Sequence, residues 1–472
     1  MLFDLFEKIR NKRFFNFLNK FFRSYFFIFL IAFIYLLSNL FSFELFAYYS
    51  IMILAIITFL FCEDLLPTIP MLAMGYMSVS RDNNPFGFNG DTIFQTKSFL
   101  IQLIIILVIC FLFLIARAIF IFIKNKENKQ FPRLTIGFGV LTFVLAIGGL
   151  FSGFYEIKTF CYGLLVGVSL SVGYFVYYYT VKWETINKEY LLLLLTTIGV
   201  LLSIEILNIN IVVGAFTTED GFSRGNIYSG WGNYNNIGCM AAMALPGPFA
   251  LAILKKEKGW IFNLIGHFNL LFLFLTQSRN SILFGLVLYL GLIITMLIFT
   301  KKKSRLFNII VLGSILVLVS IGLIILKEEV AKVFASLKNA GFDDSNRFNI
   351  YIESLTSFKD NPILGKGFYN NNIFQWGSSD RITFIPPRYH NTYIQMLCTS
   401  GVIGLLAYIY HRYQTITIIF DKVNITKILY GFAALSLPLL SLLDCHFFNL
   451  GPGLLYGICL LFIEKEKELS LI

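Results

Sequence analysis

Charged side chains are scarce in this sequence. Only 14% of its 472 residues are Asp, Glu, Lys or Arg, whereas 57% are hydrophobic, and the mean hydropathy is +0.74. A soluble domain has no core large enough to hide that much apolar surface. Apolar runs of about 20 residues recur along the chain, and each is long enough to cross roughly 30 Å of hydrocarbon as a helix. The composition therefore predicts a membrane protein that crosses the bilayer many times.

Alternation of polar and apolar residues is also missing from these runs, which argues against transmembrane strands. Every backbone polar group in lipid must be paired internally, so the runs are expected to be helices. We therefore predict an all-α polytopic protein with about 14 transmembrane helices (12–14). The expected spans lie near residues 24–43, 45–62, 64–79, 98–123, 134–151, 159–181, 190–208, 234–254, 260–276, 281–300, 306–326, 391–410, 428–444 and 447–463.

Acidic residues do not balance the basic ones, and the net charge is +11. Most Lys and Arg stand in short clusters between apolar runs, so the positive-inside rule explains the charge and no nucleic-acid partner is implied. If the weak segment 64–79 counts as a span, the clusters at 124–133, 255–259 and 301–305 all face the cytoplasm, as do both termini. Residues 1–23 are expected to form a basic amphipathic segment on the inner leaflet or a solvated basic segment.

Metal-ligand patterns are absent. The seven cysteines show no CxxC spacing and lie mostly within apolar runs, where they are typical of small buried side chains. Asp343 and Asp344 are adjacent and not spaced as DxD, and the first outer turn offers only Glu44. We therefore expect no metal site and no cofactor.

Two sizeable segments are expected on the outer face, at 209–233 and 327–390. In the second, apolar residues at helical spacing follow Arg347, and Pro362 ends the run. The residues PILGKG then predict a turn. Loops of this length in a compact architecture are usually functional.

Three arginines and one histidine fall on the predicted outer face, against the charge bias of the chain: Arg224, Arg279, Arg347 and His390. The planar fork of an arginine suits phosphate oxygens and stays charged when partly desolvated. Several arginines that converge could hold a diphosphate. The alternative for each is a contact with a lipid headgroup or a backbone carbonyl.

His390 precedes Asn391 and Thr392, which are good N-cap residues for the span at 391–410. The partial positive charge of a helix N-terminus and the charge of Arg388 both favour a neutral imidazole, and a neutral imidazole can serve as a general base. The alternative is an interfacial histidine without a task. His446 is also predicted outside and competes for the role, whereas His267 and His411 are expected to be structural.

Four stretches resemble the signature stretches of the O-antigen ligase/polymerase superfamily. They are SRGNIYSGWGNYNNIGCMAAMALP, LTQSRNSILFGLVL, RFNIYIESLTSFKDNPILGKGFYNN and HNTYIQMLCTSGVIGLLAYI. The resemblance covers roughly residues 209–412, as a core that includes the loop 327–390. Transmembrane helices precede it at 24–208, and residues 413–472 add further helices and a short cytoplasmic tail.

The resemblance implies a membrane glycosyltransferase of the GT-C type. Such proteins use a polyprenyl-diphosphate-linked sugar chain at the extracytoplasmic face and need no metal ion. By this resemblance Arg224, Arg279 and Arg347 would bind the diphosphate, and His390 would activate the acceptor hydroxyl in an inverting transfer. Supporting, site-shaping roles would fall to Asn391, Asp360, Gly365 and Gly367.

The number of spans favours a polymerase of lipid-linked repeat units for an O-antigen, a capsule or another exopolysaccharide. The alternatives are a ligase that transfers the finished glycan to lipid A-core or another acceptor, and a flippase for the same lipid-linked units. A flippase is expected to show repeat symmetry and mid-membrane polar residues. The expected location is the bacterial cytoplasmic membrane, and analogy implies a chain-length regulator and a flippase of the same pathway as partners.

Overall fold

The structure is a computed structural model of the chain. It describes residues 12–41, 43–78, 97–124, 131–215, 227–230, 232–255, 258–325, 327, 331, 347–369 and 388–469. The chain divides into two compact units. The first comprises Met1–Gln130, Val176–Ser336 and Lys465–Ile472, and the second comprises Phe131–Phe175 and Leu337–Glu464.

Helix α10 (Tyr190–Val212) lies at the centre of the first unit. Its apolar window is 78% buried, and it packs against helices from both parts of the unit. The neighbouring helices are α3 (Tyr25–Phe41), α11 (Tyr234–Ala244), α12 (Pro246–Leu254) and α13 (Gly259–Leu275). Helix α14 (Arg279–Phe299) packs on α11 and α12, and α15 (Lys302–Ile325) packs on α13 with only 6% of its window buried. A helix that is apolar all round yet exposed in this way is suited to contact with lipid.

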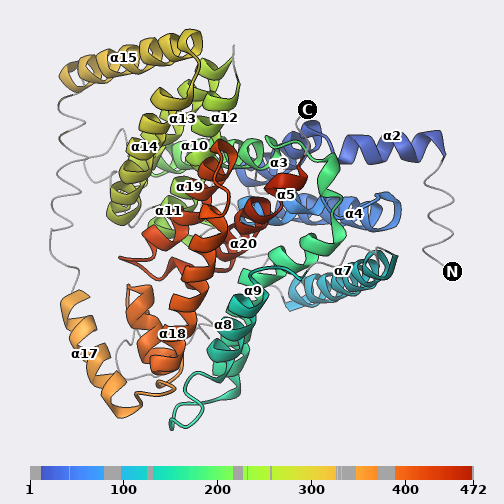
Figure 1. Cartoon of the computed structure of the whole chain (residues 1–472), viewed down its shortest axis with the longest axis vertical. Helices are drawn as coiled ribbons and strands as arrows, with labels where there is room; N and C mark the ends of the chain where they lie inside the picture. The colour runs from blue at the N-terminus through green and yellow to red at the C-terminus, as the bar shows by residue number, and fades with distance from the viewer. Residues whose placement is uncertain are drawn as a thin grey trace. The chain divides into compact units, whose positions relative to one another are not determined.

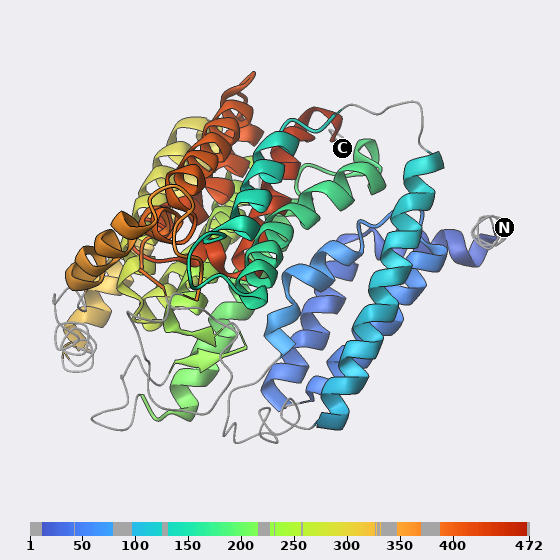
Figure 2. The same cartoon turned by 90° about the horizontal axis from the view of Figure 1, so that it is seen from below.

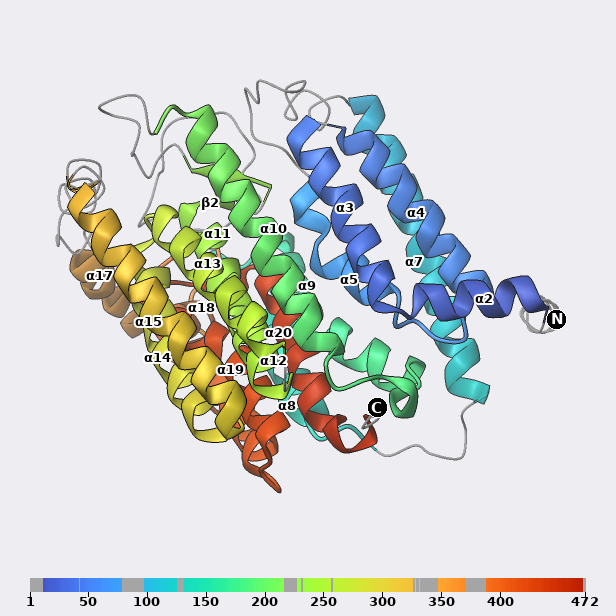
Figure 3. The same ribbon diagram turned by 90° about the horizontal axis from the view of Figure 1, so that it is seen from above.

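Helices α4 (Glu44–Phe61) and α7 (Lys97–Lys124) run side by side in the first unit, next to α3 (Figures 2 and 3). Arg117, late in α7, donates from Nη2 to the carbonyl of Cys62, directly after α4, at 2.9 Å. The later part of α7 therefore lies beside the end of α4, and Figures 2 and 3 show the two helices running in the same direction. The chain between them must return across the unit, as the predicted span at 64–79 requires.

The described segment 64–78 is not one transmembrane helix, so the prediction of a single helical span at 64–79 is wrong. The described part consists of α5 (Thr68–Ala73) and the 3-10 helix η1 (Gly75–Ser78), with six and four residues. Six residues extend about 9 Å as a helix, well short of the hydrocarbon thickness. Pro67 is the N-cap of α5, and α5 ends at Ala73, before Gly75. The Tyr35 hydroxyl donates to the carbonyl of Met71 at 2.6 Å and so holds α5 against α3.

Seven helices in the described part of the chain are long and apolar enough to cross a membrane, or eight if α2 (Arg13–Phe22) and α3 count as one bent span. These two helices meet at 68°, as expected for a segment that leaves the membrane surface to enter it. Phe14 and Phe17 on α2 are exposed. The chain is therefore an all-helical multi-pass membrane protein.

The second unit consists mainly of α8 (Thr135–Ile147), the first part of α9 (Ile157–Thr180), and four later helices (Figure 1). The later helices are α17 (Arg347–Asp360), α18 (Thr392–Phe420), α19 (Ile425–Leu440) and α20 (Leu450–Glu464), with the 3-10 helix η5 (His446–Phe448) before α20. Helix α18 packs on α8 and on α17, and α19 packs on α20. The amphipathic helix expected after Arg347 is confirmed as α17.

Helix α18 is broken at Gly401, which has φ 66° and ψ −164°. The rings of Tyr393 and Tyr408 lie 5.2 Å apart, although an unbroken helix would separate these residues by about 22 Å along its axis. The chain therefore folds back on itself at Gly401. The prediction of one uninterrupted span at 391–410 is wrong: a short arm, 392–400, leads into a longer arm, 402–420.

A wedge formed by residues 362–367 stabilises this break. The carbonyls of Pro362 and Ile363 accept from the amides of Val402 and Ile403, at 2.9 and 3.4 Å. The amides of Lys366 and Gly367 donate to the carbonyls of Cys398 and Thr399, at 2.8 and 3.0 Å. Breaking a helix in lipid leaves amides and carbonyls that must find partners, and the wedge supplies them.

Candidate functional site

The candidate site lies where the short arm of α18 begins. Asn391 is the N-cap residue, as predicted, and its Oδ1 accepts from the amides of Tyr393 and Ile394, at 2.9 and 3.1 Å. Its Nδ2 donates to the carbonyl of Leu442 at 2.8 Å, in the loop between α19 and α20. The cap therefore fixes the start of α18 against this loop.

His390 precedes the cap in a left-handed conformation with φ 52°. Its side chain is 30% exposed, and Nδ1 lies 3.3 Å from Oδ1 of Asp444. The carbonyl of His390 accepts from Tyr351 Oη on α17, at 3.2 Å. A carboxylate that accepts from Nδ1–H leaves the lone pair on Nε2, so Nε2 is the nitrogen that can take a proton.

Asp444 lies between two imidazoles. Oδ1 also accepts from the amide of Cys445 at 2.7 Å, and Oδ2 lies 3.7 Å from Nε2 of His446. Burial alone would raise the pKa of Asp444, but attraction to His446, together with the hydrogen bond and charge of His390, brings the pKa well below its usual value. We therefore assign a charged carboxylate to Asp444.

His446 is buried, and Asn449 Nδ2 lies 3.4 Å from its Nδ1. Burial lowers the pKa of His446; Asp444 opposes this effect, whereas the positive charge of Arg388 adds to it. We therefore assign a neutral ring to His446 at neutral pH. The predicted rival of His390 thus belongs to the same site, but its ring is enclosed where that of His390 is partly open.

Two arginines of the second unit act on this site. Arg347, the first residue of α17, and Arg388, just before the site histidine, both help to lower the pKa of His446. Neither forms an ion pair within the described residues. The only acidic side chain that contacts either site histidine in this part of the chain is Asp444, so the site carries an excess of positive charge.

Helix α17 is held in place by a small buried cluster of Ile350, Tyr389 and Cys398. Sγ of Cys398 also lies 3.1 Å from the carbonyl of Ser354 on α17. Through these contacts α17 packs on the short arm of α18, which brings Arg347 to the site.

Arg279 belongs to the first unit and begins α14. The turn before it contains Gln277 at φ 56°, and Ser278 Oγ donates to Asn235 Oδ1 at 3.0 Å. Asn235 lies in the first turn of α11, where Asn233 is the N-cap after a two-stranded hairpin of β1 (Tyr228–Ser229) and β2 (Gly232–Asn233). The start of α14, with Arg279, is therefore fixed beside the start of α11. Arg224, the other arginine predicted for the site, lies outside the described residues.

The remaining predicted residues belong to the wedge at Gly401. Gly365 and Gly367 have φ 69° and 84°, and a Cβ on Gly365 would lie 2.5 Å from the backbone of Thr399. Asp360 pairs with Lys366 Nζ at 2.7 Å. Their contacts stabilise the break in α18 and do not reach His390 directly.

Sequence reasoning missed Asp444 and gave Arg388 only a general contribution of charge. The signal for Asp444 was available: a single acid in the apolar stretch LSLLDCHFF, two residues before a histidine. Ionisable residues within apolar segments are usually functional, so this pair could have been combined with His390.

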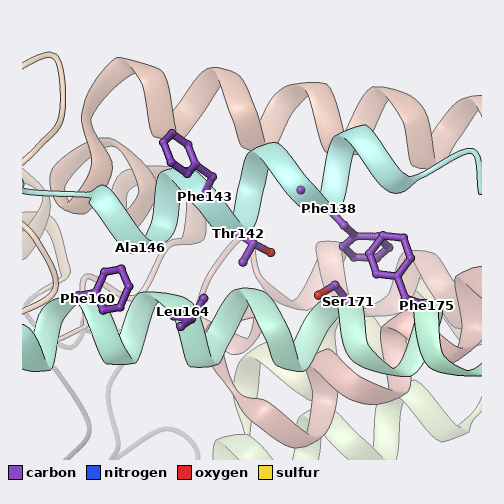
Figure 4. A pocket seen from close by; sticks show the side chains of 9 residues that line it. Phe138, Thr142, Phe143, Ala146, Phe160, Leu164, Ser171 and Phe175 are labelled. Atoms are coloured by element: carbon purple, nitrogen blue, oxygen red, sulfur yellow. The ribbon is translucent and has the colours of Figure 1, made fainter. Parts of the chain in front are cut away.

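A pocket of about 430 Å³ lies between α8 and α9 in the second unit (Figure 4). Its lining is mostly aromatic and aliphatic, with Thr142 and Ser171 as the hydroxyl-bearing residues. No charged or titratable acid–base group lines it, so it is not the site of chemistry. In the described part of the chain, no three His, Cys, Asp or Glu side chains gather as a metal site would require.

Residues 265–409 match a family model described as O-antigen ligase. The chain carries an O-antigen ligase family domain. This domain is that of membrane glycosyltransferases of the ligase and polymerase type, and it implies a lipid-linked glycan as substrate in polysaccharide biosynthesis. No curated protein matches the chain.

The O-antigen ligase family match confirms the family expected from the signature stretches. It includes three of the four stretches and contains Arg279, Arg347 and His390. The first stretch, with Arg224, precedes the matched range, and Asp444 follows it.

Proposed function

We propose that this protein polymerises polyprenyl-diphosphate-linked oligosaccharide units at the extracytoplasmic face of the bacterial cytoplasmic membrane. One observation carries the proposal: the ring of His390 is oriented by a buried carboxylate and lies beside arginines without ion-pair partners in the described residues. A base and an excess of positive charge are the two needs of glycosyl transfer from a diphosphate.

In the proposed reaction Nε2 of His390 takes the proton of an acceptor hydroxyl. The hydroxyl oxygen attacks the anomeric carbon of the donor from the face opposite the diphosphate. The new carbon–oxygen bond forms as the bond to the phosphate oxygen breaks, and the diphosphate leaves with that electron pair. Configuration at the anomeric carbon is inverted, and Asp444 stabilises the imidazolium that results.

Arg347, Arg279 and Arg224 are proposed to bind the diphosphate. Arginine forks suit phosphate oxygens and supply the positive charge that a metal ion provides in other transferases. Arg347 is supported by its place at the start of α17, which packs on α18, and by the effect of its charge on the pKa of His446. Arg279 is supported by its fixed position at the start of α14 within the family match, whereas Arg224 rests on the resemblance alone.

The proposed topology has fourteen membrane crossings, with both termini in the cytoplasm and a GT-C-like arrangement. The parallel course of α4 and α7 supports the weakest of these crossings. The basic clusters at 255–259 and 301–305 then lie inside, and α17 with the start of α18 lies on the outer side.

A ligase is the second candidate within the family, since the same base and diphosphate site would serve a different acceptor. The count of fourteen crossings favours the polymerase. A flippase is disfavoured because the sequence shows no strong internal repeat, which such a transporter is expected to have. The proposed partners are a chain-length regulator and a flippase of the same pathway.

The test uses the full-length protein in lipid nanodiscs with one polyprenyl-diphosphate oligosaccharide and no other acceptor. We expect a ladder of products for the wild type and none for His390→Ala. His390→Gln keeps a polar side chain of similar size but accepts no proton, and we expect it to be equally inactive.

A ladder that persists in both histidine variants would overturn the assignment of His390. If folded wild type forms no ladder from its native repeat unit but transfers the glycan when lipid A-core is added, the protein is a ligase. If it does neither and moves the lipid between leaflets, it is a flippase.

A further inference from the structure

Arg388 and His390 flank Tyr389 in the segment that leads into α18. Tyr389 lies between them and is 2% exposed, packed in the cluster with Ile350 and Cys398. Its amide also donates to Oε1 of Gln395 at 2.9 Å, which fixes the segment. The charges of Arg388 and His390 both act on the enclosed ring of His446, so the two side chains lie around the same buried site.

The side chain of Arg388 contacts Tyr162 on α9. A side-chain hydrogen bond joins them, and the Tyr162 hydroxyl itself donates to the carbonyl of Phe448 at 3.3 Å. Nε of Arg388 is enclosed and has no hydrogen-bond partner in the described part of the chain. The side chain is therefore positioned firmly, with part of its hydrogen-bonding capacity unused.

The charge of Arg388 also lacks a counterion in the described residues. The nearby carboxylate, Asp444, is engaged by His390 and His446. A partly buried charge without a partner is costly, and a site tolerates it when a ligand of opposite charge completes the pair.

We propose that Arg388, positioned by Tyr162, is a further residue that binds the diphosphate of the donor. The proposal rests on the proposed function, because it names one more contact to the same lipid-linked donor. Negative charge grows on the bridging oxygen as its bond to the sugar breaks, on the face opposite the acceptor hydroxyl, and a fixed guanidinium that binds the diphosphate stabilises that charge. The proton moves to His390 and the electron pair to the diphosphate, so Arg388 takes no part in the proton transfer.

The test measures binding without sugar transfer. Full-length protein in nanodiscs is titrated with a fluorescent polyprenyl diphosphate that carries no sugar, and with the matching monophosphate. We expect Arg388→Gln to weaken diphosphate binding by about 10-fold or more and to reduce the preference over the monophosphate. Arg388→Lys keeps the charge but not the fork and should lose roughly 3- to 10-fold.

Two further variants separate a ligand contact from a general effect. Tyr162→Phe removes the hydroxyl that contacts Arg388, and we expect a loss of about 2- to 5-fold in diphosphate affinity. Arg133→Gln removes an arginine of the same unit that pairs with Asp421, and its affinity should stay within about 2-fold of the wild type.

Wild-type affinity in Arg388→Gln, with the product ladder of the wild type intact, would overturn this inference and leave the proposed function standing. If the wild type binds no polyprenyl diphosphate and makes no product, the proposed function falls and the inference falls with it. If Arg388→Gln does not fold, Arg388→Lys decides, and undiminished binding by that variant rejects the contact.

Discussion

Asp444 stands between two imidazoles, and its charge decides which nitrogen of His390 acts as the base. Hydrogen bonding to Nδ1 fixes the ring and leaves Nε2 for the substrate. Nε2 of the enclosed His446 lies 3.7 Å from Oδ2, the other oxygen of the same carboxylate. This contact restricts rotation of the Asp444 side chain. The residue is therefore expected to act through His390 and not on the substrate.

Asp444→Asn should lower kcat by about 10²- to 10⁴-fold. An amide can favour the wrong tautomer of His390, and it lacks the negative charge that stabilises the imidazolium of His390. Binding of the sugar-free polyprenyl diphosphate should change by less than about 3-fold, since the arginines remain. The measurement is steady-state transfer together with the nanodisc titration. Asp421→Asn, which affects a half-exposed acid paired with Arg133, is the matched control and should leave kcat unchanged.

The pH dependence gives a second check on Asp444. Its folded pKa lies well below the usual value, so its contribution to stability is complete above about pH 4 and is lost only as pH falls further, through the folded pKa. The difference in unfolding free energy between wild type and Asp444→Asn should therefore not shrink from pH 8 to pH 5. A difference that shrinks within this range would mean that the carboxylate titrates there and that the assignment is wrong.

Individual residues were predictable from the sequence when a local rule identified them. Asn391 as N-cap follows from residue type and position, and the structure confirms it. Asp444 follows from no local rule, because it is 54 positions from His390 and only the folding of α18 against the loop after α19 brings the two together. Arg388 was visible as a charge, but its contact with Tyr162 depends on α9, far away in the sequence.

Among the helices, the break in α18 has the strongest bearing on the site. The apolar run continues through Gly401 without a proline, so hydropathy gives no sign of it. The cause lies elsewhere in the chain, in the wedge at 362–367 that pairs with the amides and carbonyls on both sides of the break. Hydropathy predicted where helices are, and it could not predict where one of them turns back.

Gly401→Ala should destabilise the protein and disable it. The backbone angles at this position are almost exclusive to glycine, and an added Cβ would lie 2.1 Å from the carbonyl of Ile363. We expect a loss of roughly 2 kcal/mol or more in thermal unfolding in detergent, together with reduced transfer, because the short arm carries His390 at its start.

Gly313→Ala on α15 provides the control for that substitution. A Cβ there meets nothing within 4 Å, and alanine favours a helix over glycine by up to about 1 kcal/mol, so stability should be equal or slightly higher. If Gly401→Ala behaves in the same way, the turn in α18 does not depend on Gly401 and the description of the break is wrong.

For the whole molecule, the sequence predicted the class of protein and its family, because composition and signature stretches do not depend on tertiary detail. The weak segment at 64–79 shows the limit of that approach. The parallel course of α4 and α7 supports the crossing itself, yet its described helices, with six and four residues, are too short to span a membrane. Counting crossings therefore needs the direction of neighbouring helices as well as hydropathy.

The proposed topology places α17 outside the cell membrane and the start of α15 inside, and single cysteines can test this. Lys359 at the end of α17 and Lys302 at the start of α15 are exposed, so each can be replaced by cysteine in a chain with Cys110→Ser and Cys161→Ser. A membrane-impermeant maleimide should label the cysteine at position 359 in intact spheroplasts. It should label the one at position 302 only after the membrane is disrupted. The reverse pattern would put His390 in the cytoplasm, where a lipid-linked glycan on the outer leaflet is out of reach, and the proposed polymerase would lose its substrate.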